Sequence, residues 1–141
     1  MPRRGLLSYD GPRKWARRPL LIKMEEGNNL KAVLYDRSSI SNPFVIDTLQ
    51  GRKAQLIDYA EKKGIEIVDV CVDIGFSGST LDRPGLQTAL RHIQEGTADV
   101  LLLMERDRLN KGVFLEVLQN LPVVVVREET QRGNQEVTHE L

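Results

Sequence analysis

The stretch GIEIVDVCVDIGFSGSTLDRPGLQTALRHIQEG (residues 64–96) contains a complete strand, loop and helix pattern, and it decides the fold class. Ile65–Val72 is a β-branched run of the kind found in buried strands. Asp73–Pro84 is rich in Gly and Ser, which predicts a mobile loop. Pro84 suits the first turn of a helix, and Gly96 suits its end. The apolar side chains of that helix recur at helical spacing and are Leu86, Ala89, Leu90 and Ile93.

Strands and helices alternate on both sides of this stretch. Upstream, the predicted elements are a strand over Lys31–Asp36, a polar loop over Arg37–Pro43 and a helix over Leu49–Lys63 that Asp47 or Thr48 caps and Gly64 ends. Downstream, they are a strand over Asp99–Met104, a short helix over Val113–Leu121 and a strand over Val123–Val126. Such alternation predicts an α/β fold, a small three-layer domain with helices on both faces of a mostly parallel sheet of about four to five strands.

Length and composition fit one ordinary globular domain. The chain has 141 residues, of which 40% are hydrophobic and 28% are charged. We expect a domain over residues 30–129, preceded by a flexible basic extension over 1–29 and followed by a disordered polar tail over 130–141. No apolar run reaches the length of a bilayer span, and Leu20–Ile22 is too short for the core of a signal peptide. These observations predict a cytoplasmic protein without a membrane partner.

Charge is balanced over the whole chain but not along it. The 20 basic and 20 acidic residues cancel, which gives no sign of a nucleic-acid binder. Residues 1–23, however, hold seven basic residues against Asp10 alone, a net charge of +6. This segment is interpreted either as a disordered tail or as an arm that contacts DNA. Its candidate DNA-binding residues are Arg3, Arg4, Arg13, Lys14, Arg17 and Arg18.

Disulfide and metal chemistry have no support in the sequence. Cys71 is the single cysteine and lies in an apolar run, where it is interpreted as a small buried hydrophobe. The two histidines, His92 and His139, are far apart and lack the spacing of metal ligands. We therefore expect no metal and no cofactor.

The loops after the first three predicted strands hold residues that suit phosphate chemistry. In a parallel sheet these loops open at one edge, where the ligands of such folds bind. Guanidinium groups meet the negative charge that builds on a phosphoryl group, so a serine among them suits attack on a phosphodiester better than acyl transfer. Neither histidine belongs to this group, which argues against a Ser-His-Asp triad. The candidate catalytic residues are Arg37, Ser39, Arg83, Asp107, Arg108 and Lys111.

Three motifs stand in order at these strand ends. The first is Tyr35–Ser39 (YDRSS), with the pattern Tyr-x-Arg-x-Ser. The second is Asp73–Leu86 (DIGFSGSTLDRPGL), with Asp-x-Gly-x-Ser-Gly followed by Arg-Pro-Gly. The third is Asp107–Lys111 (DRLNK), with Asp-Arg-Leu-x-Lys. In this order and at this spacing, the chain resembles the catalytic domain of serine recombinases of the resolvase/invertase family.

The resemblance implies a role for each candidate. Ser39 would attack the scissile phosphate, form a 5′-phosphoserine link and free a 3′-hydroxyl. Asp107 would orient Arg108 or help to shuttle the leaving proton. The residues that would bind the phosphate and its transition state are Arg37, Arg83 and Arg108, and Lys111 stands where the family has Arg. The implied partners are DNA and either further copies of this chain or a full-length recombinase.

Several residues depart from the family pattern. Arg52 falls where the family usually has Gln, and Asp36 and Ser38 replace small or apolar residues beside the nucleophile. Asp36 could trap a catalytic arginine in a salt bridge. Lys111 keeps its charge but loses the planar fork of Arg. We find no counterpart of the family's long dimerisation helix or of its DNA-binding domain in these residues, so we expect the domain to be truncated.

Two hypotheses from different classes follow. The first is an enzyme that cleaves and rejoins DNA strands. The second is a truncated or degenerate recombinase-like domain that acts through protein–protein contacts without catalysis. A third reading, a flavodoxin-like domain for a small ligand, explains the α/β pattern but not the arginines. Taken singly, Ser39 would be a turn residue and the arginines would be surface ion-pair residues, but three motifs in order favour the enzyme.

Overall fold

A computed structural model of the chain describes residues 30–109, 118 and 120–129. A 3₁₀ turn, η1, spans Arg106–Arg108, and a short helical turn over 126–129 closes the described part. The strands are β1 (Lys31–Ser38), β2 (Glu66–Ile74), β3 (Val100–Leu103) and β4 (Val123–Val125). The helices are α2 (Pro43–Lys63) and α3 (Pro84–Glu95).

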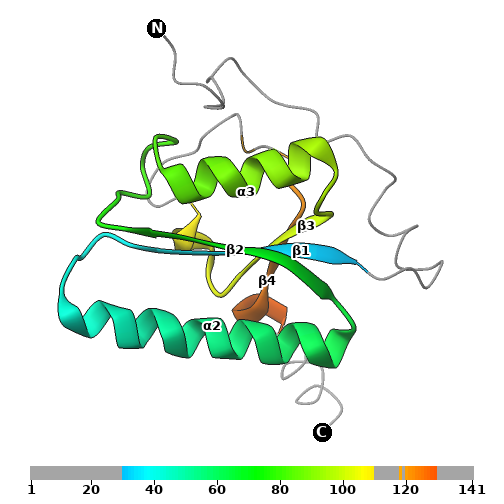
Figure 1. Cartoon of the computed structure of the whole chain (residues 1–141), viewed down its shortest axis with the longest axis horizontal. Helices are drawn as coiled ribbons and strands as arrows, with labels where there is room; N and C mark the ends of the chain where they lie inside the picture. The colour runs from blue at the N-terminus through cyan, green and yellow to red at the C-terminus, as the bar shows by residue number, and fades with distance from the viewer. Residues whose placement is uncertain (1–29, 110–117, 119, 130–141) are drawn as a thin grey trace, which may run out of the picture.

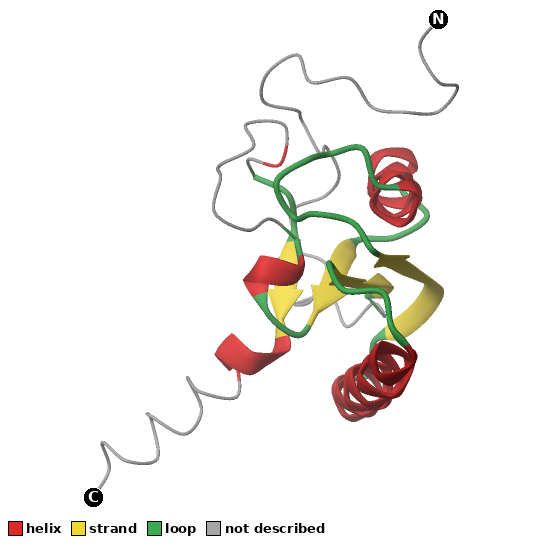
Figure 2. Cartoon of the chain, turned by 90° about the vertical axis from the view of Figure 1, so that its left-hand side faces the viewer, coloured by secondary structure: helices red, strands yellow, loops and turns green. Residues whose placement is uncertain are grey.

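The four strands form one all-parallel sheet in the order β2-β1-β3-β4. The helix α3 covers one face of this sheet, and α2 covers the other (Figure 1). A view turned by 90° shows the two helices almost end-on, with the strands between them (Figure 2). The predicted three-layer α/β fold is therefore confirmed. Within the described ranges, no helix combines the length and the apolar character that crossing a bilayer requires.

Alternate residues of β1 serve two separate cores, because successive side chains of a strand point to opposite faces. Val33 and Tyr35 pack under α3, whereas Ala32 and Leu34 pack over α2. The next residues continue this alternation, which places Asp36 on the α2 face and Arg37 on the α3 face. The charged end of β1 is thus divided between the two layers.

The helix α2 begins six residues before the predicted start. Its N-cap is Asn42, whose side-chain oxygen accepts hydrogen bonds from the Phe44 and Val45 amides at 2.9 and 3.2 Å. Pro43 occupies the first turn, where its missing N–H costs nothing. The prediction was wrong because it took Pro43 as part of a loop, and because the first turns lack a buried stripe: Phe44 is 80% exposed. The predicted end at Gly64 is confirmed by its left-handed φ of 69°.

Two strands run further than predicted, while α3 agrees. The first strand continues to Ser38 and the second to Ile74, because Arg37 pairs with Asp73 and Ser38 with Ile74 in the ladder. Asp73 is therefore strand rather than loop. The start of α3 at Pro84 and its cap at Gly96 are confirmed.

The last strand is one residue shorter than predicted. It stops at Val125, and Val126 belongs to the helical turn. Most of the predicted helix over Val113–Leu121 lies outside the described residues. Leu118 and Leu121 are described, and both pack against the α3-face core. The extension over 1–29 and the tail over 130–141 also lie outside the described residues.

Candidate functional site

The Arg37 side chain lies almost fully buried, 2% exposed, at the carboxyl end of β1. All three of its guanidinium nitrogens donate to backbone carbonyls on other loops. The Nη2 atom donates to Asp107 at 2.6 Å, Nε to Arg108 at 3.2 Å and Nη1 to Phe76 at 3.0 Å. One side chain from β1 thereby ties the loop after β2 to the η1 turn after β3. These hydrogen bonds join the three loops that were predicted to meet at one edge of the sheet.

Arg83, the residue before α3, is fully buried. Its Nε donates to the Thr80 carbonyl at 2.7 Å and its Nη2 to the Leu109 carbonyl at 2.5 Å. Its Nη1 donates to the Tyr35 hydroxyl at 3.2 Å and to the Arg108 carbonyl at 3.3 Å. The guanidinium carbon also lies 5.9 Å from the centre of the Tyr35 ring, a cation–π distance. Hydrogen bonds to four different residues thus fix the position of the Arg83 side chain.

Arg108, in η1, has the most unused donors of the three arginines at this edge of the sheet. Its Nη1 donates to the Arg37 carbonyl at 2.9 Å, and its Nη2 lies 3.4 Å from a carboxylate oxygen of Asp107. Its Nε is buried and has no hydrogen-bond partner among the described residues. A guanidinium carries five N–H donors, so one N–H on each of Nη1 and Nη2 of Arg108 also remains unpaired. Since 19% of this side chain is exposed, a ligand at the surface can reach it.

The three arginines concentrate more positive charge than the nearby carboxylates balance. Among the described residues, no ion pair joins Arg37 or Arg83 to an acidic side chain, and Arg108 has only Asp107. The pKa of Arg37 is lowered, first by burial and then by the charges of Arg108 and Arg83. Because like charges held together favour an anion between or above them, this edge of the sheet suits a phosphate.

Asp73 organises the site from β2, and the sequence analysis did not single it out as a site residue. Its carboxylate accepts the Tyr35 hydroxyl at 2.7 Å and the amides of Gly85 and Leu86 at 2.7 and 2.9 Å. It therefore caps the N-terminus of α3 from a neighbouring strand, where a carboxylate is favoured. Burial raises the pKa of Tyr35, and its bond to Asp73 raises it further. The Asp at the head of the second motif was the available signal.

Two adjacent serines differ in what their hydroxyls do. Ser38 is buried, and its Oγ donates to the Ile40 carbonyl at 3.0 Å and accepts from the Ile40 amide at 3.1 Å. Ser39 is exposed, follows the last residue of β1 and has no hydrogen-bond partner among the described residues. Of the two hydroxyls, that of Ser39 is the one free to react.

Asp36 does not trap any arginine of this site. Its Oδ2 accepts from Arg52 Nε of α2 at 2.8 Å, and its Oδ1 accepts the Arg37 backbone amide at 2.8 Å. The two departures from the family pattern noted in the sequence thus pair with each other, on the opposite face of the sheet from the buried Arg37 and Arg83 side chains. The predicted salt bridge to a catalytic arginine is wrong, because Asp36 points towards α2.

Of the remaining residues from the sequence analysis, some are described by the structure, and others lie outside the described residues. Cys71 is buried, 6% exposed, and burial raises the pKa of its thiol to about 12, as expected of a small hydrophobe. The hydroxyl of Ser77 bonds to that of Ser79 at 2.7 Å, in an exposed turn. The candidates outside the described residues are Lys111, Arg3, Arg4, Arg13, Lys14, Arg17 and Arg18.

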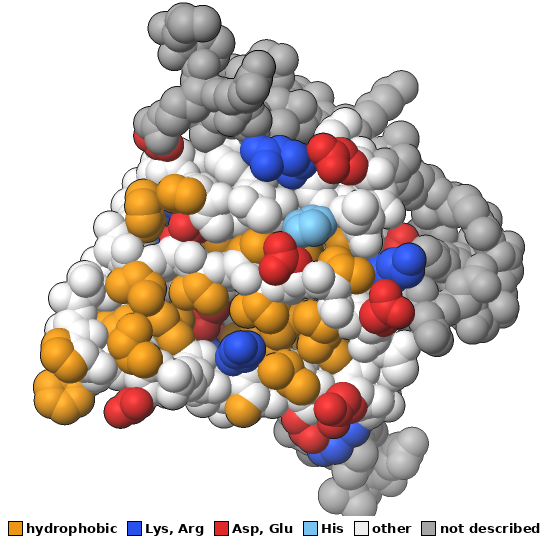
Figure 3. Space-filling model, in the orientation of Figure 1, with side chains coloured by type: hydrophobic (Ala, Val, Ile, Leu, Met, Phe, Trp, Pro, Cys, Tyr) orange, Lys and Arg blue, Asp and Glu red, His pale blue; other side chains and the backbone are white. Residues whose placement is uncertain are grey.

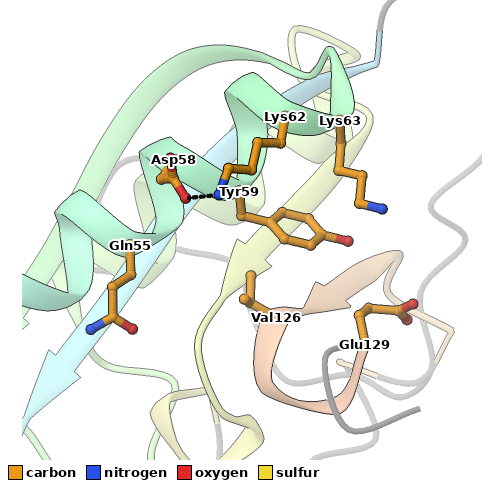
Figure 4. Close-up of a pocket in the computed structure, with 7 residues that line it drawn as sticks. All are labelled: Gln55, Asp58, Tyr59, Lys62, Lys63, Val126 and Glu129. Carbon is orange, nitrogen blue, oxygen red and sulfur yellow. Dashed lines mark ion pairs between the residues drawn. The ribbon is translucent and has the colours of Figure 1, made fainter. Parts of the chain in front are cut away.

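Two of the hollows in the described part of the chain lie away from the three arginines of this site. A pocket of about 430 Å³ opens between the second half of α2 and the 126–129 turn, and Tyr59, Lys62 and Glu129 are among its lining residues (Figure 4). A smaller apolar groove of about 190 Å³ lies under the first half of α2. Hydrophobic side chains gather beside it, over β2 and the start of α2 (Figure 3). The large exposed ones are Ile40, Phe44, Ile46, Val72 and Ile74.

Fold and site together define a parallel α/β domain with a cluster of arginines at the carboxyl edge of its sheet, and with an exposed serine directly after β1 whose hydroxyl has no partner among the described residues. The family model of the resolvase N-terminal domain matches residues 32–133, and the chain belongs to this family. The resemblance seen in the three motifs is thereby confirmed.

The solved structures that are similar to this chain include two catalytic domains. One is the C-terminal catalytic domain of ISC1926 TnpA, an IS607-like serine recombinase, with 28% identity, a TM-score of 0.59, and coverage of 77% of this chain and 78% of that one. The other is the N-terminal catalytic domain of TP901-1 integrase, with 24% identity, a TM-score of 0.56, and coverage of 78% and 97% respectively. At that identity the second match bears on the fold alone.

Proposed function

We propose that Ser39 is the nucleophile of this site-specific recombinase catalytic domain, and that its substrate is a DNA phosphodiester. The observation that carries the proposal is the contrast between the two serines at the end of β1. The Ser38 hydroxyl is hydrogen-bonded to the backbone of Ile40. Ser39, two residues after Arg37 in the sequence, is exposed, and its hydroxyl has no partner among the described residues. A serine beside uncompensated guanidinium groups is suited to phosphoryl transfer.

In the proposed step, Ser39 Oγ attacks the phosphorus atom and loses its proton to a base. The bond from phosphorus to the 3′ oxygen breaks, and that oxygen takes up a proton. The products are a 5′-phosphoserine link and a free 3′-hydroxyl, and the reverse attack by a 3′-hydroxyl rejoins the strand. No oxidant or energy source is needed, because one phosphoester bond replaces another.

The arginines divide the work of holding the phosphate. Arg108 has a further N–H on each of its two terminal nitrogens and surface access, so it is assigned direct contact with the non-bridging oxygens. Asp107 lies 3.4 Å from it and orients it. Arg37 and Arg83 are buried, and they supply positive charge from beneath while their bonds hold the loops in place. Lys111 is assigned a supporting charge from the resemblance alone.

The test is a search for a covalent protein–DNA adduct. Wild-type chain is mixed with a supercoiled plasmid, stopped with detergent and digested, and the peptide linked to a nucleotide is identified by mass spectrometry. We expect the link on Ser39, no adduct from Ser39→Ala, and an adduct from the matched control Ser38→Ala.

Three outcomes would contradict this assignment. An adduct that survives Ser39→Ala would place the nucleophile elsewhere. Loss of the adduct in Ser38→Ala, with Ser39→Ala active, would reverse the roles of the two serines. DNA binding by the wild-type chain with no adduct on any plasmid tested would favour the non-catalytic, protein-contact alternative.

DNA affinity is assigned mainly to the basic segment over residues 1–23, with its net charge of +6. Neutralising phosphates releases counterions, so binding to a plain duplex should fall steeply as salt rises. Deleting residues 1–23 should remove most of the affinity and flatten the salt dependence, as measured by fluorescence anisotropy. Unchanged affinity after the deletion would show that the body of the domain carries the DNA surface.

The chain is assigned partners of its own kind, either copies of itself or a full-length recombinase. Joining two duplexes requires that both be cut, and each catalytic domain has one Ser39. We expect sedimentation of the chain with DNA to show more than one copy per complex. A strictly single copy at every DNA ratio would contradict this part of the proposal.

A further inference from the structure

Arg37 lies in the part of β1 that extends beyond the end of its ladder with the neighbouring strand β3. The ladder between these strands ends at the pair Leu34 and Leu102, whereas β1 continues to Ser38. The Ser38 carbonyl accepts the Gly75 amide at 2.6 Å, on the β2 side. Because successive residues of a strand turn their backbone groups to opposite sides, the N–H and C=O of Arg37 face the side that β3 leaves uncovered.

Two side chains take the place of the missing strand. Asp36 Oδ1 accepts the Arg37 amide at 2.8 Å, and Arg108 Nη1 donates to the Arg37 carbonyl at 2.9 Å. The second oxygen of Asp36 is held by Arg52 Nε at 2.8 Å. The side chains of Asp36 and Arg52 are 8% and 18% exposed, so the pair is largely withdrawn from water. Removing one partner of such a pair leaves a charge with neither solvent nor a counter-charge.

We propose that Asp36 and Arg52 form a positioning pair, which fixes the projecting end of β1 against α2 and so orients Arg37 and Ser39. This inference rests on the proposed function for its catalytic consequence, but not for the geometry. Asp36 and Arg52 each depart from the family pattern, and the structure joins them in one contact. Either departure without the other would bury an unpaired charge or lose the tie to α2, so the two make sense only together.

A double-mutant cycle with a neutral pair of similar shape tests this inference. The variants are Arg52→Gln, Asp36→Asn and the double variant, each assayed where circular dichroism shows it to be folded. Arg52→Gln should slow Ser39–DNA adduct formation at saturating plasmid by about tenfold, because a charged hydrogen bond is lost and a carboxylate is stranded. The double variant should recover most of that loss, and DNA affinity should stay within about twofold, since neither residue is assigned a DNA contact.

Two matched controls lie on the same helix. Lys53→Gln removes a neighbouring exposed charge, and Asp58→Asn breaks the exposed ion pair with Lys62 at 2.9 Å. Both should leave the adduct rate unchanged, because the printed hydrogen bonds of the Asp36 carboxylate come from Arg52 and the Arg37 amide and from neither of these residues. Additive losses in the double variant, or a loss in Lys53→Gln equal to that in Arg52→Gln, would overturn the inference.

A second readout separates this inference from the proposed function. Amide hydrogen exchange reports local opening of the strand end without any reaction. The Arg37 amide should exchange about tenfold faster in Arg52→Gln than in wild type, with recovery in the double variant. If no Ser39 adduct ever forms but this pattern appears, the proposed function fails and the positioning pair stands. If exchange is the same in all variants, the positioning pair fails whatever the adduct assay shows.

Discussion

The two faces of the sheet hold their charged residues at the carboxyl edge in different ways. On the α3 face, Arg37 and Arg83 donate almost entirely to backbone carbonyls, and Asp73 accepts from a hydroxyl and two amides. On the α2 face, Asp36 and Arg52 rely on each other. The first arrangement leaves positive charge unbalanced, while the second cancels it.

This difference has a physical consequence for function and for stability. A guanidinium held by neutral carbonyls keeps its full field for a ligand, so the α3 face is suited to attract a phosphate. The charges of a guanidinium and a carboxylate in contact largely cancel. The Asp36–Arg52 pair on the α2 face is therefore suited to holding β1 in place rather than to attracting an anion. The bonds of the α3 face are also more numerous and more deeply buried, and substitutions there should cost more.

Asp73→Ala should show the largest effect on stability. It leaves the Tyr35 hydroxyl and the Gly85 and Leu86 amides without their acceptor. At about 1–3 kcal/mol for each buried donor left unpaired, the free energy of unfolding should fall by about 3 kcal/mol or more. Urea denaturation measures it. The exposed Asp58→Ala should cost less than about 0.5 kcal/mol, and equal losses in the two variants would remove the contrast between buried and exposed carboxylates.

Gly85→Ala should have a smaller effect on the same face. A Cβ at Gly85 would lie 3.0 Å from both carboxylate oxygens of Asp73 and from the Val72 carbonyl. We expect a loss of about 1–3 kcal/mol, because either the cap or the helix must shift. Gly51→Ala, on the exposed side of α2 with nothing within 4 Å, should instead stabilise the protein by about 0.5–1 kcal/mol. Thermal melts of the two variants check the opposite signs, and a neutral Gly85→Ala would mean that Asp73 can withdraw.

The smallest expected effect is a pH dependence of the free energy of unfolding that arises from Asp69 and His92. These residues belong neither to the arginine cluster nor to the Asp36–Arg52 pair. Asp69 of β2 accepts from His92 of α3 at 2.9 Å, and this bond, with that from the Val70 amide, lowers the pKa of Asp69. A carboxyl group with a lowered folded-state pKa stabilises the protein above its unfolded pKa of about 3.9. That contribution disappears as the pH falls through the folded value.

Asp69→Asn is the variant that isolates this contribution. Wild type should be slightly more stable than Asp69→Asn at neutral pH, and the difference should be smaller at an acidic pH below the unfolded pKa of about 3.9. The effect should be small because the Asp69 side chain is 43% exposed. Urea denaturation at the two pH values measures it. A difference that grows as the pH falls would have the wrong sign for this mechanism.

Much of the fold could be predicted because its signals are local. The start of α3 at Pro84, its end at Gly96 and the strand before it follow from turn chemistry and apolar spacing within a few residues. The start of α2 could not be predicted in this way. Its first turns are exposed, and Asn42 becomes a cap only when the chain turns there, so periodicity carried no signal. The ends of β1 and β2 depended on their mutual pairing, which is not local either.

The sequence by itself determined which residues meet. Three motifs at three strand ends, in a parallel α/β pattern, bring Arg37, Arg83 and Arg108 to one edge, because parallel strands end together. Only the tertiary structure decided what each group does there. It showed that Arg83 is fully buried, that Ser38 rather than Ser39 is hydrogen-bonded, and that Asp36 points to Arg52 instead of the cluster. These facts depend on the facing of a strand and on where its neighbour ends, and residue spacing does not encode either.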